Sequence, residues 1–332
     1  ILIQMIIQKS HNKIEWEFHV RKELIGINYF ELFAGTGCGG MALDNVGFQN
    51  VGYSEIDNNA LTNYNENFPN RINYGDVTKI NEKELSNFDI LIGGSPCTDI
   101  SIMKKDGEGL NGINSKLFHD YIRILNYKKP KWFIFENVRK LLTSNDGDDF
   151  EIVKKSFKTN YNIKYQILNT ADYGVPQTRR RIYIVGQRKD LGDFNYVFPN
   201  IIPLNLIAQD LLVPKVDDKY YLTDKMSKTV LSRGTGGWDA NPETDLKIAR
   251  PLCATLYKMH RASQDNYYHT YYKPIDKTNL RRLTPRECAR LQGFPDTYKI
   301  VVSDTQAYKL FGNAMSYNVV SKVIQSLVDV IN

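Results

Sequence analysis

Short apolar runs alternate with segments of helical spacing from residue 29 to about residue 189. Six runs have the length and apolar character of buried strands: residues 29–33, 51–55, 89–93, 132–136, 165–168 and 181–185. Three segments between them have helical spacing: residues 42–46, 58–67 and 116–125. This alternation is typical of parallel strands covered by helices on both faces. We therefore expect an α/β fold with a doubly wound, mostly parallel, Rossmann-like sheet.

The alternation stops after about Lys189, which indicates a change of architecture. Residues 190–304 are rich in Pro, Gly, Tyr and Arg and contain only short apolar pieces, so we expect a second, smaller and irregular domain there. Residues 316–331 return to helical spacing and are expected to pack on the sheet. The predicted division has four parts: residues 1–28 as an N-terminal extension, 29–189 as the main domain, 190–304 as the second domain, and 305–332 as a returning C-terminal segment.

Composition excludes several classes of protein. Hydrophobic residues make up 42% and charged residues 24% of the 332 positions, which is typical of globular proteins and not of disordered or fibrous chains. The apolar opening at residues 1–7 is far shorter than the roughly 20 residues of a membrane span, and no basic region of a signal peptide precedes it. We therefore expect a cytoplasmic or nucleoid-associated protein with no membrane partner. The net charge of 43 − 37 = +6 favours a polyanionic partner without requiring one.

The four cysteines are Cys38, Cys97, Cys253 and Cys288, and they are far apart in the sequence. No C-x-x-C pair occurs, so neither a disulfide framework nor a structural zinc site is expected, and we predict no metal. Most isolated cysteines are small buried apolar residues, and only local context identifies one as a nucleophile.

A glycine-rich turn follows the first expected strand and opens a helix. Gly35, Gly37 and Gly40 fit the pattern G-x-G-x-x-G, and Glu55 ends the next strand twenty residues beyond Gly35. Glycines allow the backbone to approach a ligand closely, and a carboxylate at the second strand tip can accept hydrogen bonds from ribose hydroxyls. A dinucleotide or S-adenosylmethionine fits this crevice, and with the latter Asp76 would accept from the adenine amino group. A turn without any ligand is the alternative.

Three strand ends place reactive side chains toward one crevice. Cys97 follows a buried strand, Glu136 ends the next one, and Arg179 and Arg181 adjoin a third. Residues 98–114 contain three glycines among polar residues, so we expect a loop that closes over a substrate. Taken one by one, the cysteine can be a buried structural thiol, the glutamate a solvated residue at a strand end, and the arginines part of a basic surface. Together they indicate a catalytic site.

These residues belong to six motifs that resemble, in order, those of DNA (cytosine-5)-methyltransferases of the bacterial or phage restriction-modification type. The motifs are Phe33-Ala34-Gly35, Pro96-Cys97, Glu136-Asn137-Val138, Gln177-x-Arg179-x-Arg181, Arg282-Leu283-Thr284-Pro285-Arg286-Glu287 with Gln292-Gly293-Phe294-Pro295, and Gly312-Asn313-Ala314. The resemblance runs from about Tyr29 to the C-terminus and is interrupted between roughly Lys189 and Arg281. It implies the methyltransferase version of the Rossmann-like sheet, with the second domain recognising the target.

The resemblance also implies a role for each matching position. Cys97 would be the nucleophile, Glu136 would anchor the base, and Arg179 and Arg181 would orient it. S-adenosylmethionine would be the cofactor, bound by Phe33, Ala34, Gly35, Gly37, Glu55, Ile56, Asp76, Val77, Pro96, Leu117, Asn313 and Ala314. The segment 282–295 would connect the domains.

The chain departs from the common motifs at three places. Cys38 replaces a second glycine in the cofactor loop, Ile56 replaces an aromatic residue after the ribose-binding acid, and Ser95 precedes Pro96-Cys97. Looser packing of the adenine ring is the expected consequence, and the assignment of Cys97 is unaffected.

The resemblance implies an S-adenosylmethionine-dependent methyltransferase that adds a methyl group to C5 of a cytosine flipped out of double-stranded DNA, through a bond between Cys97 and C6. We expect a monomer, with a cognate restriction endonuclease in the same system but no stable complex. A tRNA substrate is the nearest alternative, because the chemistry is identical. Two other classes stay open: a catalytically silent DNA-binding regulator and an NAD-dependent oxidoreductase.

Contacts to DNA are expected from the loop after Cys97 and from the second domain. The candidate residues are Ser101, Met103, Arg233, Gly236, Gly237, Trp238, Thr255 and Arg261. Thr255 and Leu256 resemble the Thr-Leu pair of the family's recognition domains. Trp238 is expected either to fill the space left by the flipped cytosine or to anchor the core of the second domain, and Met103 is a second candidate for the filling role.

Overall fold

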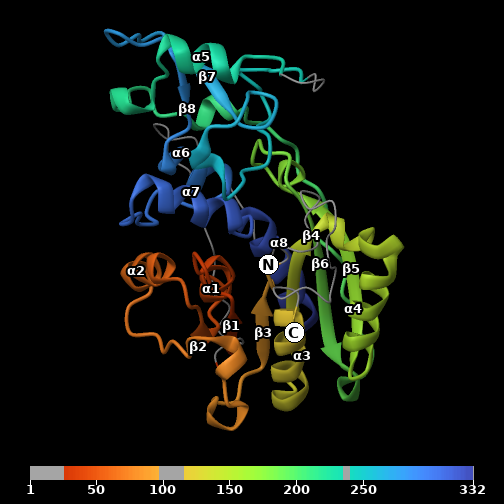
Figure 1. The fold of residues 1–332 in the computed structure, drawn as a ribbon. Helices are drawn as coiled ribbons and strands as arrows, with labels where there is room; N and C mark the ends of the chain where they lie inside the picture. Colours follow the sequence, from red (N-terminus) through yellow and green to blue (C-terminus); the bar gives the residue numbers. More distant parts are fainter. Residues whose placement is uncertain (1–25, 97–115, 235–239, 332) are drawn as a thin grey trace.

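A six-stranded sheet forms the centre of the molecule (Figure 1). The computed structural model describes residues 26–96, 116–234 and 240–331. The strands follow the order β2-β1-β3-β4-β6-β5 across the sheet. Their bounds are β1 Asn28–Leu32, β2 Gln49–Ser54, β3 Ile90–Gly93, β4 Trp132–Val138, β5 Tyr161–Asn169 and β6 Arg180–Arg188. The chain turns from β2 back across β1 to β3, which creates a crevice at the carboxyl ends of β1 and β3.

Strand β6 runs opposite to the other five, so the sheet is mostly parallel, as expected, with one antiparallel strand whose direction the apolar pattern did not predict. Its pairings with β4 and with β5 are both antiparallel. The connection between β5 and β6 spans only residues 170–179, too short for a helical crossover between parallel strands. As a result Arg179 and Arg181 lie at the start of β6, and the reversal brings them to the carboxyl edge of β4.

Helices cover both faces of this sheet. On one face, α1 (Cys38–Asp44) and α8 (Tyr317–Ile331) share a core with Ile92, Ile134 and Val185. On the other, α3 (Lys116–Lys128) and α4 (Asp148–Lys158) pack through Tyr121 and Phe157 against Phe133 and Phe135. α2 (Asn58–Asn67) lies beside α1 at the end of the sheet next to β2. The apolar stripe of α8 is fully buried from Val319 to Val328.

Much of the chain between β6 and α6 forms a smaller unit over the carboxyl edge of the sheet (Figure 1). It contains α5 (Asp224–Val230) and the hairpin β7 (Tyr267–His269) with β8 (Leu280–Arg282), around a small core that includes Leu222, Val230 and Tyr267. α6 (Pro285–Leu291) and α7 (Asp304–Asn313) lie between this unit and the sheet. Inside the junction, Arg281 and Glu287 form a fully buried ion pair of 2.7 Å. The unit has a core of its own, while the residue numbers of the four-part division stay a prediction.

Among the described helices, none has both the length and the apolar character that a membrane crossing requires.

Candidate active site

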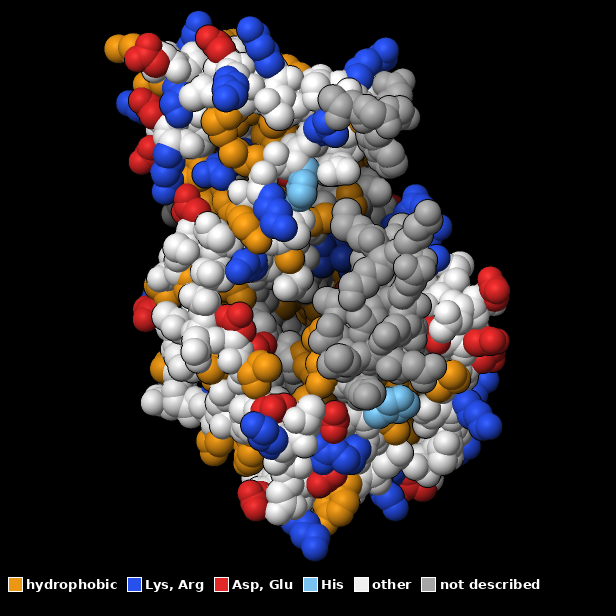
Figure 2. All heavy atoms as spheres, viewed as in Figure 1, with side chains coloured by type: hydrophobic (Ala, Val, Ile, Leu, Met, Phe, Trp, Pro, Cys, Tyr) orange, Lys and Arg blue, Asp and Glu red, His pale blue; other side chains and the backbone are white. Residues whose placement is uncertain are grey.

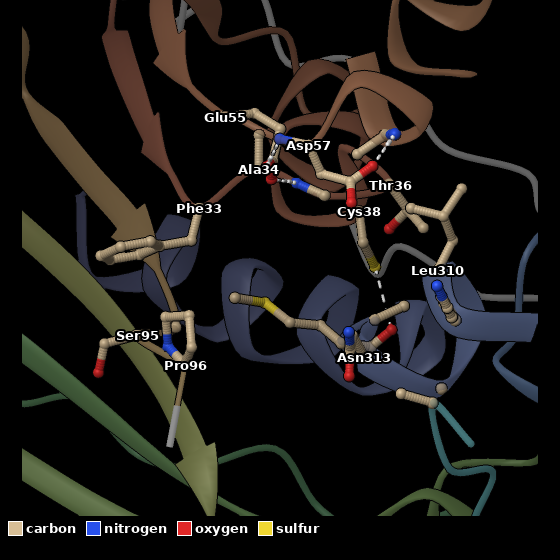
Figure 3. A pocket seen from close by; sticks show the side chains of 18 of the residues that line it. Phe33, Ala34, Thr36, Cys38, Glu55, Asp57, Ser95, Pro96, Leu310 and Asn313 are labelled. Carbon is tan, nitrogen blue, oxygen red and sulfur yellow. Dashed lines mark hydrogen bonds between the residues drawn. The ribbon is translucent and has the colours of Figure 1, made fainter. Parts of the chain in front are cut away.

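A pocket of about 650 Å³ opens at the carboxyl edge of the sheet, a volume suited to a small-molecule ligand. In Figure 3, Glu55 and Asp57 lie on one side of it, and Leu310 and Asn313 lie opposite them on α7. Most of the residues that the sequence assigns to the cofactor or the base line it: Phe33, Ala34, Gly35, Glu55, Ile56, Asp76, Val77, Pro96, Leu117, Glu136, Arg179, Arg181, Asn313 and Ala314; so does Thr255, a predicted DNA contact.

The glycine turn forms the floor of the pocket beneath α7. The backbone N–H of Ala34 donates to the carbonyl of Ser54 at 3.0 Å, which joins the tips of β1 and β2. Gly37 does not line the pocket, in contrast to its predicted cofactor contact. Its φ is 71°, and a Cβ there would lie 2.4 Å from Phe68 and 2.8 Å from Tyr64. Glycine is therefore required at residue 37 by the packing of α2 on the turn.

Glu55 is held in one orientation by three backbone amides. Its Oε2 accepts from the N–H of Gly35 at 2.8 Å, and its Oε1 accepts from the N–H groups of Ile56 and Asp57 at 2.7 and 2.8 Å. A carboxylate oxygen has room for a further hydrogen bond, so Glu55 retains acceptor capacity for hydroxyl groups in the pocket.

Asp76 lies at the next loop of the pocket and is also oriented locally. Its Oδ1 accepts from the backbone N–H of Thr78 at 3.0 Å and from the Thr78 hydroxyl at 2.8 Å. These hydrogen bonds lower the pKa of Asp76 below its ordinary value. Asp76 is thus an ionised acceptor at neutral pH.

Glu136 lies near the end of β4, two residues before Val138, and is a buried residue at 9% exposure. The Nε of Arg181 lies 3.3 Å from Glu136 Oε1, but its N–H is not directed at that oxygen, which has no hydrogen-bond partner among the described residues. Burial raises the pKa of Glu136, and the charges of Arg181 and Arg179 oppose this shift. A buried polar atom without a partner in a pocket is a site for a ligand atom.

Arg179 connects three segments of the chain. Its Nη1 donates to the carbonyl of Leu252 at 2.9 Å, and its Nη2 donates to the carbonyls of Gly312 and Ala314 at 3.1 and 2.8 Å. Burial lowers the pKa of Arg179 to about 9, so the guanidinium stays charged at neutral pH. Both terminal nitrogens of Arg179 donate to backbone carbonyls. Arg181, not Arg179, is therefore the arginine that forms the ion pair with Glu136.

Sequence reasoning missed Glu31, a second buried acid in the pocket wall. Glu31 is 3% exposed, and its Oε1 accepts from the N–H of Gly40 at 2.9 Å under the glycine turn. Burial raises its pKa to about 7. The signal in the sequence was the position of Glu31 within the apolar first strand, where an acidic side chain is buried on folding.

Sequence reasoning also missed the wall that α7 contributes. Gln306, Lys309, Leu310 and Asn313 follow helical spacing on one face of α7, and all line the pocket. The helical spacing of these four residues is visible in the sequence, but of the four only Asn313 was predicted to contact the cofactor.

The three described cysteines offer no thiolate at neutral pH. Burial raises the pKa of Cys38, Cys253 and Cys288. The Cys38 Sγ donates to the carbonyl of Met315 at 3.4 Å, so this departure from the common motif joins the glycine turn to the chain after α7 (Figure 3). The described residues contain no group of three or more His, Cys, Asp and Glu that could hold a metal ion.

Several predicted residues lie outside the described part of the chain: Cys97, Ser101, Met103, Gly236, Gly237 and Trp238. Arg233 and Arg261 are described but do not line the pocket. Arg261 donates from Nε to the hydroxyl of Ser232, next to Arg233, at 3.1 Å. Both arginines therefore belong to the surface of the smaller unit.

Comparisons with known proteins agree with this arrangement. The family model of the C-5 cytosine-specific DNA methylases matches residues 27–329. The chain is 33% identical to the Type II methyltransferase M.HhaI of Haemophilus parahaemolyticus, over 92% of this chain and 95% of that protein. It is 34% identical to the Type II methyltransferase M.SsoII of Shigella sonnei, over 91% and 80% respectively.

The fold resembles that of solved methyltransferase structures. The methyltransferase EhMeth of Entamoeba histolytica superposes with a TM-score of 0.75 at 22% identity, over 92% of this chain and 99% of that one. A DNA modification methyltransferase encoded within an E. coli prophage, described as putative, gives a TM-score of 0.71 at 20% identity, over 92% and 100%.

Proposed function

Because the chain belongs to the family of C-5 cytosine-specific DNA methylases, we propose that it moves the methyl group of S-adenosylmethionine to a flipped-out cytosine, with Cys97 as nucleophile. Methylation of cytosine C5 in DNA follows from the family. The cofactor, the flipped base and the residue roles are the proposal. The single observation that supports the roles most strongly is the buried Oε1 of Glu136, which lies 3.3 Å from Arg181 Nε and accepts no hydrogen bond from the described residues, in the same pocket as the glycine turn.

The cofactor end of the pocket fits S-adenosylmethionine. Glu55 presents a carboxylate whose direction is fixed by backbone amides, as binding of two ribose hydroxyls requires. Asp76 presents an ionised acceptor suited to an adenine amino group. When bound, S-adenosylmethionine supplies an electrophilic methyl group. Asn313 and Pro96 line the same space and would contact the cofactor there.

The protein's part in the chemistry begins with a thiolate. Cytosine C5 is a poor nucleophile until C6 carries a substituent, so Cys97 adds to C6 and forms a C6–S bond. The electron pair displaced from the C5–C6 bond makes C5 nucleophilic toward the methyl group. After methylation a water molecule takes the proton from C5, the C5–C6 double bond returns, and the C6–S bond breaks to regenerate the thiolate. Cys97 directly follows Pro96, which lines the pocket.

Glu136 and Arg181 stabilise the charge that this addition creates on the ring. Burial raises the pKa of Glu136, which favours a protonated carboxyl that can donate to ring N3. Its other oxygen can accept from the exocyclic amine. Arg181 is positioned to donate to O2, since its guanidinium lies beside Glu136 in the pocket. Arg179 would act indirectly, by holding the segments at Leu252 and Gly312 around the base.

Duplex DNA buries the target atom, so the nucleotide must leave the stack at a cost of about a few kcal/mol. We assign this work to the smaller unit, residues 190–304 in the predicted division, together with the segment after Cys97. Figure 2 shows a hollow below this unit with Lys and Arg side chains along its upper margin. A phosphate backbone would be attracted to such a margin. The relatives' designation as Type II methyltransferases supports a cognate restriction endonuclease as a functional partner.

A methyl-transfer assay tests the substrate class. The protein is incubated with S-adenosylmethionine labelled in its methyl group and with either unmethylated genomic DNA or tRNA, and the nucleosides are analysed by mass spectrometry. The expected product is 5-methylcytosine in DNA. Label in tRNA alone would overturn the DNA assignment. Glu136→Gln is the matched variant, expected to lose roughly 10²–10⁴-fold in turnover, because an amide can donate a hydrogen bond to N3 but cannot transfer a proton to it.

A calorimetric titration tests whether the glycine turn binds S-adenosylmethionine or NAD. S-adenosylhomocysteine is expected to bind wild type and Glu136→Gln equally, and NAD is expected not to bind. Binding of NAD alone would favour the oxidoreductase hypothesis and contradict the methyltransferase account.

A further inference from the structure

Lys309 is a half-buried cation in the pocket wall that the chemistry described so far does not use. It extends from α7, one helical turn before Asn313, and lines the pocket. Its ammonium lies 5.5 Å from the ring centroid of Tyr257, a pocket residue contributed by the smaller unit. The pair therefore bridges the two parts of the molecule at the pocket.

Carboxylates line the pocket as well, but none of those described forms an ion pair with Lys309. Of the two arginines in the lining, Arg179 is bonded to three carbonyls and Arg181 lies beside Glu136. Within residues 26–96, 116–234 and 240–331, Lys309 forms neither an ion pair nor a hydrogen bond, and its ammonium faces the ring of Tyr257. A lysine that faces a pocket with this single weak partner can bind an anionic ligand.

The turn that follows Tyr257 is anchored by two hydrogen bonds. The N–H of His260 donates to the buried Asp265 at 2.7 Å, and the hydroxyl of Tyr267 donates to the His260 carbonyl at 2.6 Å. Met259, between Tyr257 and these anchors, has a φ of 52°, a left-handed conformation that a side chain rarely adopts without support. The backbone that carries Tyr257 is therefore anchored, and the ring faces the Lys309 ammonium.

A second lysine extends the positive charge outward from the same ring. The Lys258 ammonium lies 6.0 Å from the Tyr257 centroid, and its side chain is exposed. Lys309 in the pocket and Lys258 on the surface thus flank one aromatic ring. The two ammonium groups thus form a short basic strip that runs from the pocket to the surface of the smaller unit.

We propose that Lys309, held by Tyr257, binds a DNA backbone phosphate next to the flipped target cytidine. The inference rests on the proposed function and extends it to a residue that holds the flipped nucleotide in place. A phosphate fits better than the carboxylate of the cofactor, because the ring that positions Lys309 belongs to the unit that would carry DNA and because Lys258 continues the strip outward. A lysine binds phosphate as a point charge, independent of base identity.

The test is the salt dependence of DNA binding by Lys309→Gln. Binding to a 24-bp duplex that wild type methylates is measured by fluorescence anisotropy between 50 and 200 mM KCl. Loss of one phosphate contact lowers the slope of log K against log salt by about 0.9, which corresponds to roughly eightfold weaker binding at 0.1 M salt. The affinity for S-adenosylhomocysteine should not change.

Two further variants isolate the cause. Lys309→Arg keeps the charge and is expected to restore the slope. Lys83→Gln removes the same charge from an exposed position in the 3-10 turn Glu82–Glu84, which belongs to the opposite end of the main body, and should behave as wild type. Thermal melts of both Lys309 variants check that they fold.

Each outcome decides between stated alternatives. An unchanged slope for folded Lys309→Gln contradicts the inference, and an unchanged slope with weaker S-adenosylhomocysteine binding would identify the cofactor carboxylate as the partner. Failure of wild type to bind or methylate any duplex would contradict the proposed function instead. Binding and methylation of DNA by wild type, with a reduced slope only for Lys309→Gln, supports both.

Discussion

Glu31 makes the stability of the folded chain depend on pH. Its carboxyl group is buried under the glycine turn, and burial raises its pKa to about 7 from an ordinary value of 4.5. A raised pKa means that the folded state prefers the protonated form. The stabilisation is complete below pH 4.5, and it is lost as the pH rises through 7 because the folded state must then hold a buried charge.

The size of this effect follows from the two pKa values. At 1.36 kcal/mol per pKa unit, integration over the titration gives a loss of roughly 2.5 kcal/mol in the free energy of unfolding between pH 5 and pH 8. Glu31→Gln carries no charge at any pH and can still accept from the Gly40 N–H. The variant should therefore gain about that amount relative to wild type over the same range.

Urea unfolding of both proteins at pH 5, 6, 7 and 8, at constant ionic strength, measures the difference. Glu84→Gln is the matched control, because Glu84 is exposed and its substitution should leave the pH dependence unchanged. If the stability curves of wild type and Glu31→Gln stay parallel from pH 5 to pH 8, Glu31 does not bind a proton in this range and the reasoning is wrong.

Three other substitutions test the pocket. Gly94→Ala places a Cβ 2.7 Å from the Glu136 carbonyl oxygen, so the backbone must shift; we expect a loss of about 1–3 kcal/mol in a denaturant melt together with reduced turnover. Arg179→Met leaves three carbonyls without their donor and should cost about 3 kcal/mol or more, measured in the same way; a loss under 1 kcal/mol would show that the bonds contribute little. Glu55→Gln turns an amide N–H₂ toward backbone donors and should weaken S-adenosylhomocysteine binding at least roughly tenfold in calorimetry, and an unchanged Kd would remove Glu55 from the cofactor site.

Local patterns predicted much of this site. The strand positions, the glycine turn and the strand-end residues Glu55 and Glu136 follow from apolar runs and from side chains placed where those runs stop. Such features depend on a few neighbouring residues. The edge of the sheet then brings them together, since carboxyl ends of parallel strands share one edge.

Features that depend on distant partners were not predicted. The direction of β6 is not encoded in its apolar run, although the short connection from β5 was a sign of reversal. The role of Arg179 depends on carbonyls at Leu252, Gly312 and Ala314, which only the folded chain brings together. The contact of Lys309 with Tyr257 joins α7 to the smaller unit in the same way.

The central claim is that Cys97 forms the bond to cytosine C6, and covalent trapping tests it most directly. A duplex with 5-fluorocytosine at the target position is incubated with the protein and S-adenosylmethionine, and the adduct is resolved on a denaturing gel and mapped by peptide mass spectrometry. Fluorine at C5 cannot leave as the proton does, so the adduct persists. We expect a single adduct at Cys97 that is absent from Cys97→Ser, while that variant still binds S-adenosylhomocysteine. An adduct at Cys38, Cys253 or Cys288, or none with a duplex that the enzyme methylates, would contradict the mechanism.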